Sequence, residues 1–180
     1  MITAAFCFRS GWDPAGRLLS PALAGGGLLD VGVYTVSLAS MVFGGPPADV
    51  AAMAHIGETG VDEQSAILLR YDAGRLAALT CAIRTFLPHE AVVAGTEGYV
   101  RLPHPFWKTD RLFLGRDPGA EELVKLPYAG NGYQCEAEEV QRCLRAGKLE
   151  SDVMPLSETL SVMQTLDRIR AQWGLTYPME

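Results

Sequence analysis

The stretch GGGLLDVGVYTVSLASMVFGGPP, residues 25–47, decides how this sequence folds. Between its glycine triplet and its Gly-Gly-Pro-Pro end lie residues 28–43, which are mostly apolar and carry Asp30 as their only charged side chain. This composition, followed by a glycine stop signal, predicts one helix over 28–43. Because the helix is apolar on nearly every side, we expect it to be buried on more than one face.

Short apolar runs separated by turn residues lie on both sides of this helix. Val, Ile, Leu and Ala dominate these runs, which is typical of strands. In chain order, the predicted strands are residues 2–8, 49–56, 65–71, 76–85, 91–94, 99–102, 111–114 and 122–126. The turns at 72–74, 95–98 and 117–119 join successive strands as hairpins. Consecutive hairpins predict an antiparallel meander rather than parallel crossover units.

Two further helices are predicted near the end of the chain, over 133–146 and 155–173, each followed by a glycine. Strands followed by helices indicate an α+β fold class: an open-faced, mainly antiparallel β-sheet with helices packed on one face. A length of 180 residues suits one domain, so we expect a single domain over 1–180.

The central predicted hairpin is apolar on both of its faces. One face carries Ile67, Leu69, Leu79, Cys81 and Ile83, and the other carries Ala66, Leu68, Ala78, Thr80 and Ala82. A sheet with one wet face alternates between apolar and polar residues, and soluble monomers rarely expose large apolar patches. We therefore expect a homodimer through the second face. The alternative is that a further domain covers this face.

Charge and composition limit the partners and the location of the chain. Its net charge is −6, whereas a nucleic-acid partner calls for a basic face. With 48% apolar and 20% charged residues, the sequence is that of a folded chain. No unbroken apolar run reaches the length of a membrane span, and the N-terminus has no signal-peptide pattern. We expect a cytoplasmic protein with neither a nucleic-acid nor a membrane partner.

The cysteines and histidines form no recognisable metal or redox motif. Cysteines stand at 7, 81, 135 and 143, which matches no CxxC spacing. Histidines stand at 55, 89 and 104, outside any HxxxH or HExxH pattern. We expect reduced thiols, no metal site, and solvated histidines in the loops at 89 and 104.

Asp30 and Tyr34 are the candidate catalytic residues. At i,i+4 they share one face of the predicted helix, and a buried carboxylate is costly unless it has partners. A tyrosine hydroxyl near a carboxylate can move a proton at a substrate hydroxyl. The alternative is that Asp30 serves the helix N-terminus and Tyr34 belongs to the core. Gly32, which costs about 1 kcal/mol in a helix interior, indicates that a side chain there would collide with a neighbour.

Phe106 and Trp107 are the candidate substrate-binding residues. They lie in the loop HPFWKTD and could wall a pocket, as aromatic rings do for sugars, although loop aromatics more often serve packing. The triplet 25–27 does not match a dinucleotide fingerprint, which requires G-x-G-x-x-G directly after a strand. We interpret the triplet as a hinge at which the backbone passes close to another element.

With these residues in view, the sequence resembles a known enzyme family. GGGLLDVGVYTVSLASMVFGGPP is similar to the start of the C-terminal domain of the glucose-fructose oxidoreductase/inositol dehydrogenase (Gfo/Idh/MocA) family. The variant DVGVY resembles the branch of dihydrodiol and xylose dehydrogenases. Further similarity lies in VAGTEGYVRLPHPFW and in the final block from NGYQCEAEEV onward, so that the resemblance covers nearly the whole chain.

The resemblance implies the C-terminal domain of a two-domain dehydrogenase whose N-terminal Rossmann domain binds NAD(P). It also implies a Glu-Lys-Pro segment with a catalytic lysine, and none of Lys108, Lys125 and Lys148 lies in such a segment. Family members commonly pair through the sheet, which agrees with a homodimer. We expect no cofactor bound by this chain alone and no hydride transfer by it.

The function implied is the substrate-binding and dimerisation half of an NAD(P)-dependent oxidoreductase acting on a sugar, cyclic polyol or trans-dihydrodiol. In that enzyme Tyr34 would contact the hydroxyl being oxidised, and Asp30 would orient it or the lysine. The alternative is a stand-alone, non-catalytic module for ligand binding or dimerisation.

Overall fold

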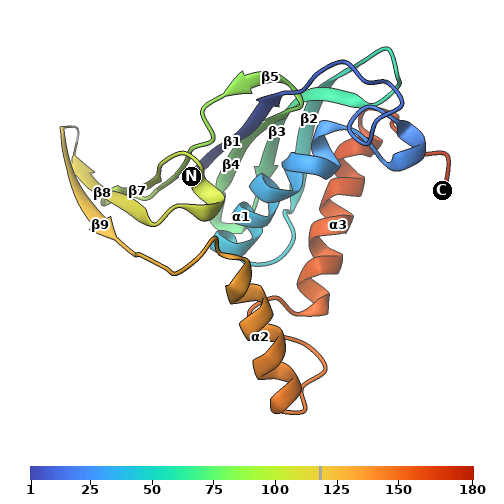
Figure 1. Ribbon diagram of the computed structural model, residues 1–180. Coiled ribbons are helices and arrows are strands. Elements are labelled where there is room, and N and C mark those ends of the chain that lie inside the picture. Colours follow the sequence, from blue (N-terminus) through green and yellow to red (C-terminus); the bar gives the residue numbers. More distant parts are fainter. Residues whose placement is uncertain (118) are drawn as a thin grey trace.

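The computed structural model describes residues 1–117 and 119–180, and these residues form a mixed, open sheet of nine strands (Figure 1). The order in the sheet is β2-β3-β4-β1-β6-β7-β8-β9, with β5 pairing separately with β1. The strands are β1 (Ile2–Arg9), β2 (Asp49–Ile56), β3 (Asp62–Arg70), β4 (Leu76–Ala82), β5 (Arg84–Leu87), β6 (Ala91–Ala94), β7 (Tyr99–Leu102), β8 (Arg111–Asp117) and β9 (Ala120–Lys125). Part of the predicted turn at 117–119 lies outside the described residues.

Helical segments occupy the long connections and the end of the chain. The main helices are α1 (Val33–Phe43), α2 (Tyr133–Arg145) and α3 (Leu156–Ala171). A π-helical turn, η2 (Leu28–Gly32), leads directly into α1. Short 3-10 turns are η1 (Pro21–Leu23), η3 (Asp72–Gly74) and η4 (Phe106–Lys108). The predicted α+β class with helices on one face of a mainly antiparallel sheet is confirmed.

The prediction of a purely antiparallel meander is wrong at one pair of strands. β1 pairs with β4 in parallel, from Ile2 opposite Ala77 to Cys7 opposite Ala82. Parallel neighbours need a long connection, and the chain between β1 and β4 supplies it by running through η2 and α1 and then through β2 and β3. The meander prediction is confirmed for β2-β3-β4 and for β6-β7-β8-β9. The predicted strand 76–85 is divided at Ile83, after which β5 pairs with β1.

The core lies between the sheet and the layer formed by η2, α1 and α3 (Figure 1). Leu28 and Val36 from the first helical stretch meet Leu166 and Ile169 of α3, and all four side chains are fully or almost fully buried. Helix 28–43 is therefore covered by the sheet on one side and by α3 on another, as its composition predicts. Ile67, Leu69 and Leu79 face this core from the strands; their neighbours Ala66 and Leu68 are exposed on the open face.

The helical stretch Pro21–Phe43 is long and apolar enough to cross a membrane, whereas the absence of an unbroken apolar run predicts no such segment. In the structure, 56% of its most apolar window is buried inside the chain. Packing between the sheet and α3 thus accounts for its apolar composition.

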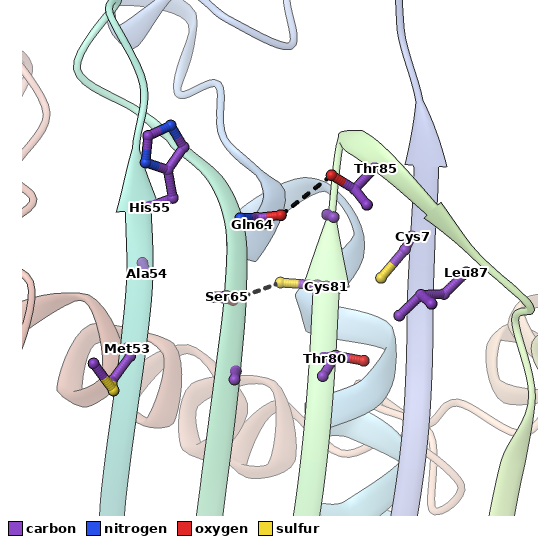
Figure 2. Close-up of a pocket in the computed structure, with 12 residues that line it drawn as sticks. Cys7, Met53, Ala54, His55, Gln64, Ser65, Thr80, Cys81, Thr85 and Leu87 are labelled. Carbon is purple, nitrogen blue, oxygen red and sulfur yellow. Dashed lines mark hydrogen bonds between the residues drawn. The ribbon is translucent and has the colours of Figure 1, made fainter.

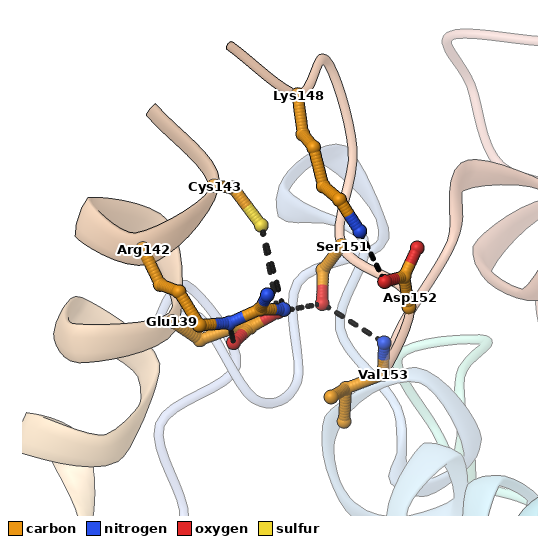
Figure 3. Close-up of polar contacts among 7 residues, drawn as sticks. All are labelled: Glu139, Arg142, Cys143, Lys148, Ser151, Asp152 and Val153. Atoms are coloured by element: carbon orange, nitrogen blue, oxygen red, sulfur yellow. Dashed lines mark hydrogen bonds and ion pairs between the residues drawn. The ribbon is translucent and has the colours of Figure 1, made fainter. Parts of the chain in front are cut away.

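Helix α2 projects away from the sheet and is joined to the following loop by polar contacts (Figures 1 and 3). The Glu139 carboxylate accepts hydrogen bonds from Arg142, at 2.6 and 2.7 Å, and from the Ser151 hydroxyl. Arg142 lowers the pKa of Glu139 to about 2. Ala137, Val140 and Leu144 recur at helical spacing and predict an apolar stripe on this helix, but Val140 and Leu144 are exposed in the structure.

Replacing Leu166 with Ala should lower the free energy of unfolding by about 2–5 kcal/mol, because a fully buried leucine leaves a cavity. Leu160→Ala in the same helix should cost less than about 1 kcal/mol, since Leu160 is 59% exposed. Urea unfolding of both variants measures the difference. Equal losses would contradict this placement of α3.

Candidate functional site

Tyr34 lies at the start of α1 against aromatic rings from two other elements. The Trp107 ring of η4 stacks on the Phe6 ring of β1, with centroids 3.8 Å apart and planes within 8°. The Tyr34 ring meets Phe6 edge-on at 5.2 Å and Trp107 at 5.9 Å. These three residues, which we call the aromatic cluster, bring one strand, one helix and one loop to a single point. Tyr34 remains 43% exposed and can reach a ligand.

Two cavities flank the aromatic cluster, and Tyr34 and Trp107 line both of them. The first, here called the polar cavity, has a volume of about 580 Å³. Its other lining residues are Lys108, Thr109, Tyr128, Asn131, Gly132, Tyr133, Cys135 and Glu136. It therefore combines aromatic surfaces with an ammonium group, an amide and a carboxylate. Such a lining can hold a small ring that carries hydroxyl groups.

The second cavity, here called the apolar cavity, has about 590 Å³ and lies between α1 and the start of α3. Leu38, Met41, Leu102, Phe106, Val153 and Met154 supply most of its wall. Ser37, Ser40 and Glu158 add polar groups, and the Ser40 hydroxyl donates a hydrogen bond of 2.5 Å to Glu158. This cavity suits the less polar part of a ligand.

The two predicted substrate-binding aromatics have different places. Phe106 is buried in the core, packs edge-on against Trp107 at 5.5 Å, and lines only the apolar cavity of the two. Trp107 is half-buried and separates the two cavities. The packing and pocket interpretations of these loop aromatics therefore both apply.

Asp30 lies apart from the cavities. Its carboxylate forms an ion pair with Arg17, whose side chain is mostly exposed. Asp30 itself is largely buried, and it is not among the described residues that line either cavity. Of the four predicted site residues, the structure gathers Tyr34, Phe106 and Trp107, and it places Asp30 one turn before Tyr34 with Arg17 as its partner.

The expectation that His89 is solvated is wrong. Its ring is 8% exposed, with Nε2 2.7 Å from the Cys7 carbonyl oxygen, and it lies 5.2 Å from the Trp107 ring. The His89 backbone N–H donates to His104 Nδ1 at 3.2 Å. The chain folds back here from β5 into β6 alongside β1, which carries His89 beneath the aromatic cluster. His104 is exposed as expected.

Sequence reasoning missed several residues of the site. Phe6 lies in a strand whose alternation gives its face, but only the pairing of β1 with β4 places that face under Tyr34. Lys108 of η4 and the segment 128–136, which leads into the start of α2, come together at the polar cavity. Nothing in the local sequence around these residues indicates that they lie beside Tyr34 and Trp107.

The glycine triplet offers no free phosphate-binding turn. Gly25, Gly26 and Gly27 are buried, and the Leu28 N–H after them donates to the Asp62 carboxylate. An added Cβ at Gly25 would lie 2.7 Å from the Leu18 carbonyl oxygen, so the backbone does pass close to another segment, as predicted. The groups at this helix start therefore do not fit a dinucleotide.

Within residues 1–117 and 119–180, no three His, Cys, Asp or Glu side chains lie together as a metal site. The four cysteines are free thiols, and burial raises the pKa of both Cys7 and Cys81. These two thiols are therefore poor nucleophiles.

A separate hollow of about 340 Å³ lies on the open face of the sheet (Figure 2). Cys7, Met53, His55, Gln64, Thr80 and Leu87 are among its lining residues. It shares no lining residue with either cavity beside Tyr34. The sheet thus separates it from the aromatic cluster.

Known proteins resemble this chain along nearly its whole length. The profile of the GFO/IDH/MocA C-terminal domain matches residues 1–101. The trans-1,2-dihydrobenzene-1,2-diol dehydrogenase of Oryctolagus cuniculus is 39% identical over 171 residues, which cover 91% of this chain and 52% of the relative. The enzyme of that name from Homo sapiens is 37% identical over 170 residues, covering 91% and 51%. The chain spans about half the length of these curated relatives.

Solved structures share the fold at lower sequence identity. An aldose-aldose oxidoreductase from Caulobacter crescentus, complexed with glycerol, has a TM-score of 0.80 at 20% identity and covers 96% of this chain and 53% of its own. A 3-ketoreductase from Actinomadura kijaniata, in complex with NADP and TDP-benzene, has a TM-score of 0.77 at 21% identity, covering 94% and 52%.

Gly32 allows η2 to lie against β4, and its replacement is a test of that contact. A Cβ on Gly32 would lie 2.9 Å from Cys81 Sγ and 3.1 Å from Leu28 Cδ1. Gly32→Ala should therefore destabilise the chain by up to about 3 kcal/mol through overpacking. In a Cys81→Ala background the same change should stabilise it by up to about 1 kcal/mol, because the helix then gains alanine's better propensity.

Thermal unfolding of the single and double variants gives the coupling between the two sites. Gly11→Ala is the control, because a Cβ there has nothing within 4 Å. A Gly32→Ala cost that is the same in both backgrounds would contradict the close approach.

Proposed function

We propose, because this chain belongs to the GFO/IDH/MocA family, that it is the substrate-binding half of an NAD(P)-dependent oxidoreductase acting on a sugar, cyclic polyol or trans-dihydrodiol. The observation that carries the proposal is Tyr34, a partly exposed hydroxyl on the wall shared by two cavities. The family match supports the reaction type, and the mixed lining of the polar cavity supports a hydroxylated ring as substrate.

In this proposal Tyr34 binds the hydroxyl that is oxidised and takes part in moving its proton. Trp107 offers a flat face to the substrate ring, and Phe106 supports Trp107 from the core. Asp30, held by Arg17, adds a negative charge one turn away from Tyr34. In this proposal NAD(P) would be held by the half of the enzyme that precedes this chain in its relatives, and would supply the hydride-transfer chemistry there.

The alternative function is a non-catalytic module for ligand binding or dimerisation. It is favoured by one observation: residues 1–180 contain no G-x-G-x-x-G phosphate loop directly after a strand. A catalytic assay of the chain joined to a cofactor domain separates the two proposals.

Replacing Tyr34 with Phe should reduce kcat at least about 100-fold, because it removes the hydroxyl that handles the proton. The assay joins residues 1–180 to the N-terminal half of the rabbit relative and follows NADP⁺ reduction with trans-dihydrodiols, pentoses, hexoses and inositols. Tyr99→Phe is the matched control, because Tyr99 lies in β7 and its hydroxyl binds Glu121.

Three outcomes decide this test. Turnover lost only in Tyr34→Phe supports the proposal, and full activity of that variant contradicts the role of Tyr34. A fusion that binds NADPH but turns over none of these substrates favours the non-catalytic module.

The isolated chain should not bind NADPH at micromolar concentration, and fluorescence titration checks this.

We also propose that two copies of the chain pair through the open face of the sheet. Met53, Leu68, Leu76 and Leu87 are exposed on that face. Met53 and Leu87 line the hollow in Figure 2, and Leu68 and Leu76 line a second depression. An apolar face of this kind is covered by a self-complementary copy in a two-fold dimer. The competing explanation is that another domain of a longer protein covers it.

Ala78→Glu should split such a dimer, because Ala78 lies in the middle of the open face, opposite Leu68. Leu79 is unsuitable for this test, since it is 1% exposed and faces the core. Ala137→Glu, the same change on exposed α2, should leave the dimer intact. Sedimentation at micromolar concentration measures all three chains, and a monomer for the unchanged chain would contradict the proposal.

A further inference from the structure

Asp62 is a buried carboxylate that the proposed reaction does not use. It is the first residue of β3 and is completely buried. Its Oδ2 accepts the backbone N–H of Leu28 at 2.7 Å, across 34 residues of sequence. Leu28 is the first residue of η2, so this carboxylate binds the start of the helical stretch that carries Asp30 and Tyr34.

The glycine triplet is shaped around this carboxylate. A Cβ on Gly26 would lie 2.3 Å from Asp62 Oδ1, and one on Gly27 would lie 3.3 Å from Oδ2. Gly26 also has a φ of +116°, which favours glycine. The absence of side chains at these positions therefore leaves room for Asp62.

A second long-range contact holds the triplet from another side. The Tyr177 hydroxyl donates a hydrogen bond of 2.8 Å to the Gly25 carbonyl oxygen, and Tyr177 is buried. The triplet is thus bound both by β3 and by the segment after α3. The turn that follows is π-helical, a form that often occurs at functional sites.

The distance from this contact to the site is short. Tyr34 follows Leu28 by six residues, which is roughly 9 Å of helix. Within that length Gly32 presses against Cys81 of β4, so the segment has little freedom to shift sideways. A change in the position of Leu28 is therefore passed along the helix to Tyr34.

We propose that Asp62 is a positioning residue, which sets the place of Tyr34 beside Trp107 by binding the start of its helix. Any effect of Asp62 on turnover rests on the proposed function. The position of the Tyr34 ring does not, because it is measurable in the isolated chain. Asp62 would act through the backbone of Leu28 and would touch no substrate.

The protonation of Asp62 provides a readout. Burial raises its pKa to about 7, and the N–H groups of Leu28 and Gly27 act in the opposite direction. The neighbouring titratable groups are Tyr177, whose pKa is raised to about 12, and Cys81, whose pKa is raised by burial. Asp62 is therefore the member of this group that titrates near neutral pH.

Protonation of Asp62 makes the stability of the chain depend on pH. Because the pKa of Asp62 is higher in the folded chain than in the unfolded chain, the folded chain holds the proton more tightly. The stabilisation that the Asp62 proton gives to the folded chain is complete below about pH 4 and is lost as the pH rises through 7. The melting temperature of the wild type, relative to Asp62→Asn, should fall across this range.

The test is NMR of the 180-residue chain with ¹⁵N-labelled backbone and ¹³C-labelled tyrosine rings. The Tyr34 ring is sensitive to its position, since Phe6 lies 5.2 Å away. In the wild type, the amide peaks of Gly27 and Leu28 and the ring peaks of Tyr34 should shift with one common midpoint. In Asp62→Asn, which keeps an acceptor oxygen, they should stay near their wild-type positions without that titration.

Asp62→Ala should displace the peaks from Leu28 to Tyr34 and speed amide exchange at Leu28 at least tenfold. The control is Asp49→Ala, which removes an exposed carboxylate at the start of another strand, bonded to the Val50 N–H. It should disturb only its own neighbourhood.

Tyr34 peaks that stay in place in Asp62→Ala would overturn the proposal. If that variant fails to fold, the wild-type titration decides, and a midpoint seen at Leu28 but not at Tyr34 would overturn it. These outcomes are independent of turnover, so they are distinguishable from failure of the proposed function.

Discussion

The close contact between an apolar helix and a sheet is the constraint on which the rest of the structure depends. Helix 28–43 has almost no polar side that could face water, so it must be covered on several sides. The sheet covers one side and α3 another, and Gly32 lets the backbone approach Cys81 of β4. Burial of this one segment therefore determines where α3 lies and how near the helix comes to the strands.

The candidate site is a consequence of the same contact. The chain from β1 to its parallel neighbour β4 runs through η2, α1, β2 and β3, and the helical part carries Tyr34 over the face of β1 on which Phe6 lies. Trp107 then stacks on Phe6 from a loop far along the chain. Each of the three rings comes from an element that contributes to the core, so that a strand, a helix and a loop together form the wall between the two cavities.

Much of the fold could be predicted from local patterns. The bounds of β2, β6 and β7 agree with the prediction, and helix 28–43 and both late helices lie where their glycine signals place them. The parallel pairing of β1 could not be predicted, because alternation gives the two faces of a strand but not its neighbour. In the same way, the spacing of apolar residues predicts an apolar face on α2, but it does not say whether another element covers that face, which is exposed in the structure. The site was predictable where its residues lie on one helix or in one loop, and unpredictable where distant segments meet, as at Phe6 and His89.

Neighbouring residues of β1 serve the two faces of the sheet. Phe6 supports the aromatic cluster on the helix-covered face, whereas Cys7 lies at the hollow on the open face (Figure 2). Successive side chains of a strand point to opposite faces, so one strand can carry the proposed substrate site and the proposed dimer surface without sharing a side chain between them. A change on the open face could reach Tyr34 through the backbone of β1 or β4, or through Cys81, which lines the hollow and lies against Gly32. Both strands are central in the sheet and bonded on each side, so a shift of their backbone would have to break ladder hydrogen bonds to two neighbouring strands.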